Sequence, residues 1–543
     1  MIGTRTLTTA MCRTVAACVA VHRPCWFAAN WGSTFASMTS RPRLASFAAL
    51  TIAALAFTGC AASQNPSGAD ADATSLTWGW RLPTSWDPVT STAGWDTHAL
   101  ALVYDGLTQL NTDGEPVPGL AESWEYNDDG TAITFHLRDD GTFSDGTPVT
   151  ADAVKLNLER GRDQENSTLA GQLRIITAVD AVDEYTVTVH LDQADYQVPY
   201  LFAGKTGFIV NPTAFDDVAS LATQPEGAGP FALTEYVPNA HATLEKNDEY
   251  WNADHIFIDE LSVVPVADDA TAVAGVTSGQ WDVSLIPASQ AQGAETAGLQ
   301  IEEIKALTVR ALDVNGTVAP FDDQRVLQAI SHATDRQALI DTTYFGHGTP
   351  NWQPFPDGYV AHNDDLDDLY AHDVKAAKSL LAEAGYPDGV DITLTLGEDD
   401  TALAELLQAQ WAEAGIRVTL NVQASAAISQ NYVQRTFPFV LDSFSGRQSP
   451  LQALEVLYGP EGLMNLGRQT PDELTAAIDT ARATPTDDPE YAQRLQDAVE
   501  VGVTLQPNTF LFSWPRILIH SERVTGIQHW LDVQRWEDVK VEG

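Results

Sequence analysis

Residues 120–158, LAESWEYNDDGTAITFHLRDDGTFSDGTPVTADAVKLNL, contain the most regular pattern in the chain. Ile133, Phe135 and Leu137 alternate with polar residues, and a period of two is typical of a half-buried strand. The Asp-, Gly- and Pro-rich letters that follow predict turns. Thr150 then stands where a hydroxyl can cap a helix, and three apolar residues beyond it fall on one helical face: Ala151, Val154 and Leu158. The stretch therefore predicts a strand, an acidic turn and a capped helix in series.

The same alternation returns downstream and predicts a second strand that pairs near the first. Its apolar positions are Tyr185, Val187, Val189 and Leu191. Between residues 392 and 422, an alternating run is followed by a helical stripe that ends at Gly415 and by another alternating run. Strand, helix and strand form a βαβ unit, so we expect an α/β fold.

Three shorter patterns refine the C-terminal half. Asp322 is placed to cap a helix, and Thr470-Pro471-Asp472-Glu473 has the form of a capping box. The apolar residues 510–519 predict a return to strand.

Acidic residues dominate the composition, with 74 Asp and Glu against 29 Lys and Arg and a net charge of −45. The acidic residues are scattered along the chain, which indicates that they lie on the solvent-exposed surface. Such a chain is expected to repel nucleic acid and anionic membrane surfaces. Its length predicts more than one domain.

The first sixty residues contain no Asp or Glu and all four cysteines. Met38 begins a short cationic segment, and residues 44–57 form an apolar run that suits a signal peptide and is too short to span a bilayer. We therefore interpret residues 1–37 as a mis-assigned extension and residues 38–59 as the signal peptide. A long genuine leader is the alternative.

The signal ends in Phe57-Thr58-Gly59-Cys60-Ala61, which resembles a bacterial lipobox. Cys60 would be the one cysteine left in the mature chain, so an internal disulfide or a Cys-based metal site is excluded. We expect lipidation of Cys60 and anchoring at the outer face of the cytoplasmic membrane, with residues 60–74 as a flexible tether. An ordinary signal peptide with a chance cysteine is the alternative.

Motifs for enzymes, metals and cofactors are missing from the sequence. It has no nucleophile elbow, Walker A loop, HExxH or Rossmann glycine pattern. His362 and His372 flank an acidic run whose spacing is not that of an EF-hand, and we interpret it as a solvated loop. The prediction is a protein without enzymatic activity, metal or cofactor.

Aromatic residues in loops and at strand ends predict a ligand cleft, because aromatics bury apolar area with little loss of entropy. The candidates are Trp80, Trp95, Phe444 and Trp514. Core packing is the alternative for each.

A set of ordered motifs resembles one known family. The motifs are Tyr104-Asp105-Gly106-Leu107, Leu120-Ala121-Glu122-Ser123-Trp124, Phe143-Ser144-Asp145-Gly146-Thr147-Pro148, Gly227 to Phe231, Asn247 to Trp251, Ser278 to Val283, and Phe321 to Val326. In order and spacing they are similar to the family 5 extracellular solute-binding proteins, which include oligopeptide-, dipeptide- and nickel-binding receptors of ABC importers. The resemblance covers residues 75–543.

The resemblance implies a two-lobed, type II periplasmic-binding-protein-like fold with an extra subdomain in lobe I. Lobe I would be 75–310 plus 511–543, its extra subdomain 96–224, and lobe II 311–510. Hinge strands would lie near Thr308 to Asp313 and Asn508 to Trp514. A monomer would close on a peptide or other small molecule and then dock on the transmembrane subunits of an ABC permease.

Peptide-binding members of the family hold the ammonium of the peptide with an Asp in a segment that resembles residues 442–450. Here Arg447 or Ser449 falls near that position. We expect Arg447 to offer its fork to a carboxylate, another anion or carbonyl oxygens. An arginine that only bridges loop carbonyls is the alternative.

Two other functions remain open at this point. A surface sensor or chaperone-like binder would use the same lobes without import, and a secreted hydrolase would need a nucleophile and base that the sequence does not show. A nickel or haem receptor has little support from Met464 and the scattered histidines.

The proposed start at Met38 predicts the mass of the unprocessed precursor. Intact-mass measurement should find a chain that begins at Met38, because residues 38–59 already form a self-sufficient signal. A peptide containing Trp26 in a digest of the precursor would contradict this start.

Overall fold

The computed structural model describes residues 74–424, 427–428, 434–505 and 508–542. The described residues belong to one compact unit. Among the described residues, no helix is long and apolar enough to cross a bilayer. The interpretations of residues 1–37, 38–59 and 60–73, including Cys60, fall outside the described residues.

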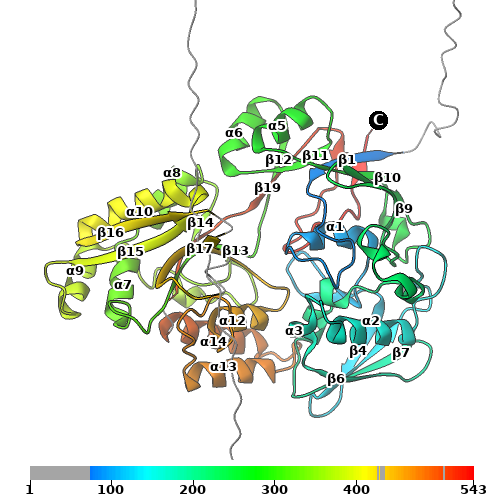
Figure 1. Cartoon of the computed structure of the whole chain (residues 1–543), viewed down its shortest axis with the longest axis horizontal. Helices are drawn as coiled ribbons and strands as arrows, with labels where there is room; N and C mark the ends of the chain where they lie inside the picture. The colour runs from blue at the N-terminus through cyan, green and yellow to red at the C-terminus, as the bar shows by residue number, and fades with distance from the viewer. Residues whose placement is uncertain (1–73, 425–426, 429–433, 506–507, 543) are drawn as a thin grey trace, which may run out of the picture. The chain divides into compact units, whose positions relative to one another are not determined.

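A seven-stranded sheet contains the first strand of the described chain and the late strand β19 (Figure 1). Central β1 runs parallel to β10 and β11, and the other pairings are antiparallel. Helices α5 (Asp269–Thr277) and α6 (Ala288–Thr296) contact this sheet. In spatial order its strands are β12 (Gln300–Ile304), β19 (Arg516–His520), β11 (Val283–Ile286), β1 (Ser75–Trp80), β10 (Glu260–Pro265), β9 (His241–Lys246) and β8 (Phe231–Val237).

A four-stranded antiparallel sheet contains the two strands of the stretch 120–158. Its order is β4 (Ala121–Tyr126), β5 (Ala132–Leu137), β7 (Thr186–Leu191) and β6 (Ile176–Ala181). The predicted pairing is confirmed, because Phe135 on β5 lies opposite Val187 on β7. The predicted cap is confirmed too, since the hydroxyl of Thr150 accepts a hydrogen bond from the backbone N–H of Ala153 at the start of α2 (Ala151–Asp163). In the turn between them, Gly146 has φ +82°, a conformation that favours glycine.

Short elements complete this half of the chain. They are α1 (Asp96–Val103), α3 (Ala170–Leu173), α4 (Val198–Leu201), the strand pair β2 (Thr108–Leu110) and β3 (Pro116–Pro118), the strand pair β20 (Val524–Thr525) and β21 (Lys540–Val541), and single 3₁₀ turns at Lys205–Gly207, Pro212–Asp217, Ser220–Ala222 and Ala253–His255.

A six-stranded sheet organises the second half. Its order is β14 (Thr349–Pro350), β18 (Thr509–Ser513), β13 (Thr308–Val314), β17 (Phe439–Ser445), β15 (Val390–Gly397) and β16 (Ile416–Gln423). The predicted βαβ unit is confirmed, since β15 and β16 are parallel and α10 (Thr401–Ala414) joins them. α10 ends at Gly415 with φ +89°, and the indole N–H of buried Trp411 donates to Thr334 Oγ1 at 2.8 Å. The other helices are α7 (Gln324–His332), α8 (Arg336–Thr343), α9 (Val374–Glu383), α12 (Pro450–Tyr458), α13 (Asp472–Arg482) and α14 (Tyr491–Leu505), with 3₁₀ turns at Asp364–Leu366 and Glu398–Asp400.

Two expected helix caps are wrong in detail. Asp323, one residue after Asp322, caps α7 by accepting from the N–H of Arg325. Thr470 does not cap α13, because its hydroxyl donates to the Tyr458 carbonyl oxygen at 2.5 Å instead. A tertiary partner thus competes successfully with the local cap.

The chain passes between the seven- and six-stranded sheets at two short crossings. Residues 305–307 join β12 to β13, and residues 514–515 join β18 to β19. The apolar run 510–519 is therefore two strands in two different sheets, because Pro515 cannot donate a ladder hydrogen bond. The strands near which the hinge is expected, Thr308 to Asp313 and Asn508 to Trp514, lie mostly in the six-stranded sheet and adjoin the two crossings.

One fully buried carboxylate links distant segments of the first half. Asp105 accepts hydrogen bonds from Gln109 Nε2 at 2.9 Å, Trp251 Nε1 at 2.8 Å and the hydroxyl of Tyr250 at 3.2 Å. Arg535 Nη1 lies 3.8 Å from the same carboxylate. Burial raises the pKa of Asp105, while Arg535, Trp251 and Gln109 oppose the shift.

Asp105→Ala is expected to lower the free energy of unfolding by about 3–5 kcal/mol, because it leaves Arg535 and three donors buried without this partner. Urea denaturation at pH 7 measures the change. Asp391→Ala is the matched control, since Asp391 pairs with Arg417 on the surface and its loss should change the stability far less. Equal effects of the two variants would contradict the role of Asp105.

Candidate functional site

A cavity of about 640 Å³ lies beside the two crossings. One side is formed by residues 92–95, 97–98, 168–169, 172, 205–206 and 531–533, and the other by residues 445–448 at the end of β17 and in the loop after it. Residues 306–308 and Arg516 at the crossings complete the wall. The volume falls in the range of small-molecule sites, roughly 300–1,000 Å³. A molecule in this cavity would touch segments that belong to both large sheets.

Three basic side chains line the cavity. Lys205 Nζ donates to the Ser91 carbonyl oxygen at 2.9 Å, to Ser91 Oγ at 3.0 Å and to Thr168 Oγ1 at 3.4 Å. Arg447 Nη1 donates to the carbonyl oxygens of Ser445 at 2.5 Å and Gly446 at 3.2 Å. Arg516 Nη1 donates to the Asp532 carbonyl oxygen at 2.7 Å, and its Nη2 donates to that of Trp530.

Burial sets the electrostatics of these cations. It lowers the pKa of Lys205 and of Arg447, and it lowers the pKa of Arg516 to about 10. Asp532 is the one acidic residue among the described residues of the wall, and burial raises its pKa. His98 is held neutral, since burial and then the charge of Arg516 lower its pKa to about 3.

Two residues predicted from the sequence do meet in this cavity. Trp95 is 44 % exposed, and the Arg81 guanidinium lies 4.9 Å from its ring centroid. Arg447 lines the opposite side. In this conformation Arg447 bridges loop carbonyls, as the alternative interpretation expected, and its Nε and Nη2 have no hydrogen-bond partner among the described residues.

The other predicted residues lie elsewhere. Trp80 stacks on Trp78 at 5.5 Å and meets the edge of His98, so it supports the wall from behind. Phe444 is 1 % exposed and packs in the hydrophobic core with Val309 and Leu451, because β17 directs it away from the cavity.

Ser449 is buried and caps α12, where its hydroxyl accepts from the N–H of Gln452 and also donates to Gln197 Oε1 at 3.1 Å. Trp514 lines a second cavity of about 620 Å³. The expectation that Phe444 and Ser449 face the cleft is therefore not met in this structure.

The sequence interpretation missed Lys205, His98, Arg516 and Asp532 in the wall. One signal was present for the cations. In a chain with 29 basic and 74 acidic residues, Lys205 and Arg516 have no acidic residue within four positions. Such isolation predicts a basic side chain that is not used for a local ion pair.

In the second cavity, the positive charge of Arg310 is paired with the negative charge of Asp400. Arg310 forms an ion pair with Asp400 at 2.9 Å and donates to the hydroxyl of Tyr344 at 3.1 Å, with its guanidinium 5.3 Å from the Trp514 ring centroid. Burial alone would lower the pKa of Arg310, but Tyr344 and Asp400 raise it.

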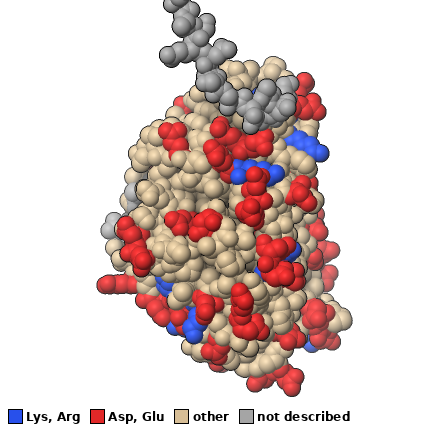
Figure 2. All heavy atoms as spheres, turned by 90° about the vertical axis from the view of Figure 1, so that its right-hand side faces the viewer, with Lys and Arg blue, Asp and Glu red and all other residues tan. Residues whose placement is uncertain are grey.

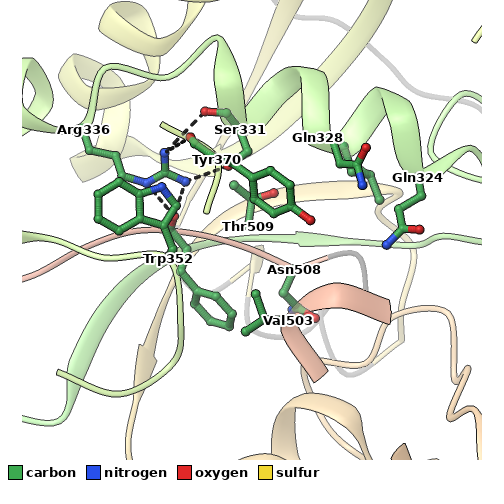
Figure 3. Close-up of a pocket in the computed structure, with 11 residues that line it drawn as sticks. Gln324, Gln328, Ser331, Arg336, Trp352, Tyr370, Val503, Asn508 and Thr509 are labelled. Carbon is green, nitrogen blue, oxygen red and sulfur yellow. Dashed lines mark hydrogen bonds between the residues drawn. The ribbon is translucent and has the colours of Figure 1, made fainter. Parts of the chain in front are cut away.

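A third pocket surrounds Arg336 within the six-stranded half (Figure 3). Arg336 lies over Trp352, with 4.8 Å from the guanidinium carbon to the ring centroid, and donates to the Phe510 carbonyl oxygen and the Ser331 hydroxyl. The space is about 20 Å³, which suits a single water. Arg336 therefore links the start of α8 to β18 through its hydrogen bond to Phe510, and the space around it is too small for a solute.

Asp357, His362 and Asp364 bring three potential metal-ligand atoms within 4.8 Å of one another. Both ring nitrogens of His362 have protein partners, at 3.0 Å from the Phe355 carbonyl oxygen and 3.4 Å from Gln353 Nε2. The side chain of Asp364 is 91 % exposed. This geometry agrees with the predicted solvated acidic loop, and we assign no metal to it.

Comparison with known proteins gives matches that extend over most of the chain. The pattern described as "Bacterial extracellular solute-binding proteins, family 5 Middle" matches residues 115–464. Heme-binding protein A of Haemophilus influenzae is 30 % identical over 351 residues, which cover 58 % of this chain and 63 % of that protein. The glutathione-binding protein of Shigella flexneri is 30 % identical over 321 residues, 58 % of this chain and 62 % of that protein. The matched region thus spans less than two thirds of both relatives.

A solved structure extends the likeness. HbpA2 from Haemophilus parasuis superposes with a TM-score of 0.77 at 25 % identity, over 87 % of this chain and 100 % of that one. The ordered motifs, the two large sheets joined by two crossings and the matched residues 115–464 agree. This chain belongs to the family 5 bacterial extracellular solute-binding proteins and has their two-lobed α/β fold.

Proposed function

We propose that the chain is an extracytoplasmic receptor that binds a peptide-like or other small solute in the 640 Å³ cavity and delivers it to an ABC import permease. The observation that carries this proposal is the composition of the wall, which takes residues from both large sheets, from the crossing at 305–307 and from Arg516, which follows the other crossing. Such a site favours the closed form, because a solute there gains contacts on both sides at once. The relatives named for haem and glutathione binding support a small-molecule ligand. No catalytic step is part of the proposal.

The two lobes would correspond to the two large sheets. Lobe I would contain the seven-stranded sheet and, as its extra subdomain, the four-stranded sheet, and lobe II the six-stranded sheet. Closure would be a rotation at residues 305–307 and 514–515, where the chain makes its two passages. Lipidation at Cys60 would keep the receptor on the membrane near its permease.

Contacts between the four-stranded side and the helices α12–α14 would hold the lobes together. Gln197 Nε2 donates to the hydroxyl of Tyr491 at 3.0 Å, and Gln197 Oε1 accepts from Ser449. Nearby, Arg482 forms an ion pair with Asp195 at 3.2 Å. These groups are buried, so each interaction contributes to closure without competition from water.

Trp95→Ala and Trp514→Ala form a matched pair of variants that tests the site. Dialysed protein is incubated with yeast extract, and native mass spectrometry reads the retained solute. We expect the wild type and Trp514→Ala to retain the solute and Trp95→Ala to lose it. Of these two tryptophans, Trp95 lines the proposed site and Trp514 lines the second cavity. Retention that depends on Trp514 and not on Trp95 would move the site to the second cavity. Absence of any retained solute would contradict the function.

Gln197→Ala is expected to weaken solute binding roughly 2- to 10-fold, because it removes hydrogen bonds worth about 0.5–1.5 kcal/mol from the closed form. Gln493→Ala is the control, since Gln493 bonds only to Asp497 on the exposed face of α14. Titration calorimetry with the retained solute measures both. An unchanged affinity in Gln197→Ala would show that this contact is equally present in the open form.

A further inference from the structure

The cavity has the opposite charge balance from the rest of the protein. Acidic side chains are scattered over the face shown in Figure 2, and basic ones are few. Among the described residues of the cavity wall, Lys205, Arg447 and Arg516 outnumber the single acid Asp532. Three of only 29 basic residues thus gather around one space in a chain of net charge −45.

Three other largely buried arginines have carboxylate partners, whereas Arg336 is buried against carbonyl and hydroxyl oxygens alone. Arg160 lies 2.6 Å from Asp87, Arg482 lies 2.7 Å from Glu455, and Arg535 lies 2.7 Å from Glu537. Although burial lowers the pKa of Arg535, the charges of Glu537 and Asp105 raise it overall. Within the described residues, no carboxylate lies within 4 Å of Lys205, Arg447 or Arg516. Lys205, Arg447 and Arg516 therefore lack the close carboxylate that Arg160, Arg482 and Arg535 have, although the more distant Asp96 and Asp87 partly oppose the effect of burial on the pKa of Lys205.

The acid in the wall does not supply that charge at close range. Asp532 Oδ2 accepts from Gln448 Nε2 at 3.0 Å, which fixes it beside the loop that carries Arg447. Arg447 and Arg516 keep pKa values below the ordinary value in spite of Asp532, because burial outweighs its attraction. A desolvated cation without a partner is costly, and an anion that enters would remove that cost.

The free donors of Arg447 point to an oxyanion that can present two oxygens to the guanidinium. Arg447 uses Nη1 on loop carbonyls, which orients the guanidinium and leaves Nε and Nη2 for a second acceptor. A guanidinium fork fits the two oxygens of a carboxylate or phosphate. Arg516 is fixed by the carbonyl oxygens of Trp530 and Asp532, and Lys205 by Ser91, so both act as fixed charges in the wall.

We propose that the solute carried by this receptor is an anion whose carboxylate or phosphate group is held by Arg447 between Lys205 and Arg516. The inference rests on the proposed function, since it names the chemical class of the solute for that same cavity. A free ammonium group of the solute would not be its anchor in this cavity. The wall would present Lys205, Arg447 and Arg516 to it, with Asp532 as the one acidic residue among the described lining residues.

Fractionated yeast extract is the probe that tests the proposal. An anion exchanger at pH 7 separates the extract into a retained, anionic fraction and an unretained fraction. Each fraction is added to dialysed protein, and the thermal midpoint is measured. We expect only the anionic fraction to raise the midpoint. Phosphatase treatment of that fraction should abolish the shift for a phosphate ligand and preserve it for a carboxylate.

Arg447→Gln should raise the amount of anionic fraction needed for half of the midpoint shift about 10- to 100-fold. This is the change in affinity expected from the loss of one or two charge-assisted hydrogen bonds. Arg447→Lys should recover part of the loss, because it keeps the charge and loses the fork. Arg417→Gln removes an equal charge from the surface and should behave as the wild type. Lys205→Gln is the second test variant if Arg447→Gln does not fold, and it should also weaken the response.

The possible results distinguish failure of the anionic-ligand proposal from failure of the proposed receptor function. A midpoint raised by the unretained fraction at least as much as by the anionic one would overturn the anionic ligand and leave the receptor function standing. No shift with either fraction would overturn both. A full response of Arg447→Gln and Lys205→Gln to the anionic fraction would overturn the roles of these cations.

Discussion

The buried carboxylate of Asp105 is the interaction on which lobe I depends. It joins the end of α1, the start of β2, the turn after β9 and the C-terminal segment through Gln109, Tyr250, Trp251 and Arg535. A buried charge persists only when its partners are all in place, so these four segments must assemble together. The adjacent Gly106 is equally constrained, because a Cβ there would lie 2.5 Å from the Phe202 carbonyl oxygen. Fixed at this end, α1 holds Trp95 and His98 in the cavity wall at its other end.

The same network explains why short family motifs are recognisable. Tyr104 to Leu107 and Asn247 to Trp251 are distant in sequence, and they supply the acceptor and two of the donors of one hydrogen-bonded cluster. Their residue types are set by burial and pairing. The motifs therefore identify the family through its scaffold, whereas the cavity is lined by loops that the scaffold leaves free to vary.

Patterns that depend on local physics could be predicted from the sequence. The strand at Ile133, the cap at Thr150 and the βαβ unit that ends its helix at Gly415 follow from alternation, hydrogen bonding and positive φ. Features decided by tertiary partners could not. Thr470 bonds to Tyr458 instead of capping, and Phe444 enters the core, since the face of β17 that is buried depends on its neighbours. Trp514 and Arg447 sit in similar loops, but the position of the crossings places them in different cavities.

Arg516 lies in the wall of both large cavities, one residue after the Pro515 that ends the second crossing. Its guanidinium is fixed to the carbonyl oxygens of Trp530 and Asp532, so it cannot be turned toward one space without altering the other. The two spaces therefore share one wall residue, and a ligand that displaced Arg516 in one space would also reshape the other. Any coupling of that kind would be reciprocal, because thermodynamic linkage is symmetric. The return strand thus gives the two spaces a common wall as well as connecting the two sheets.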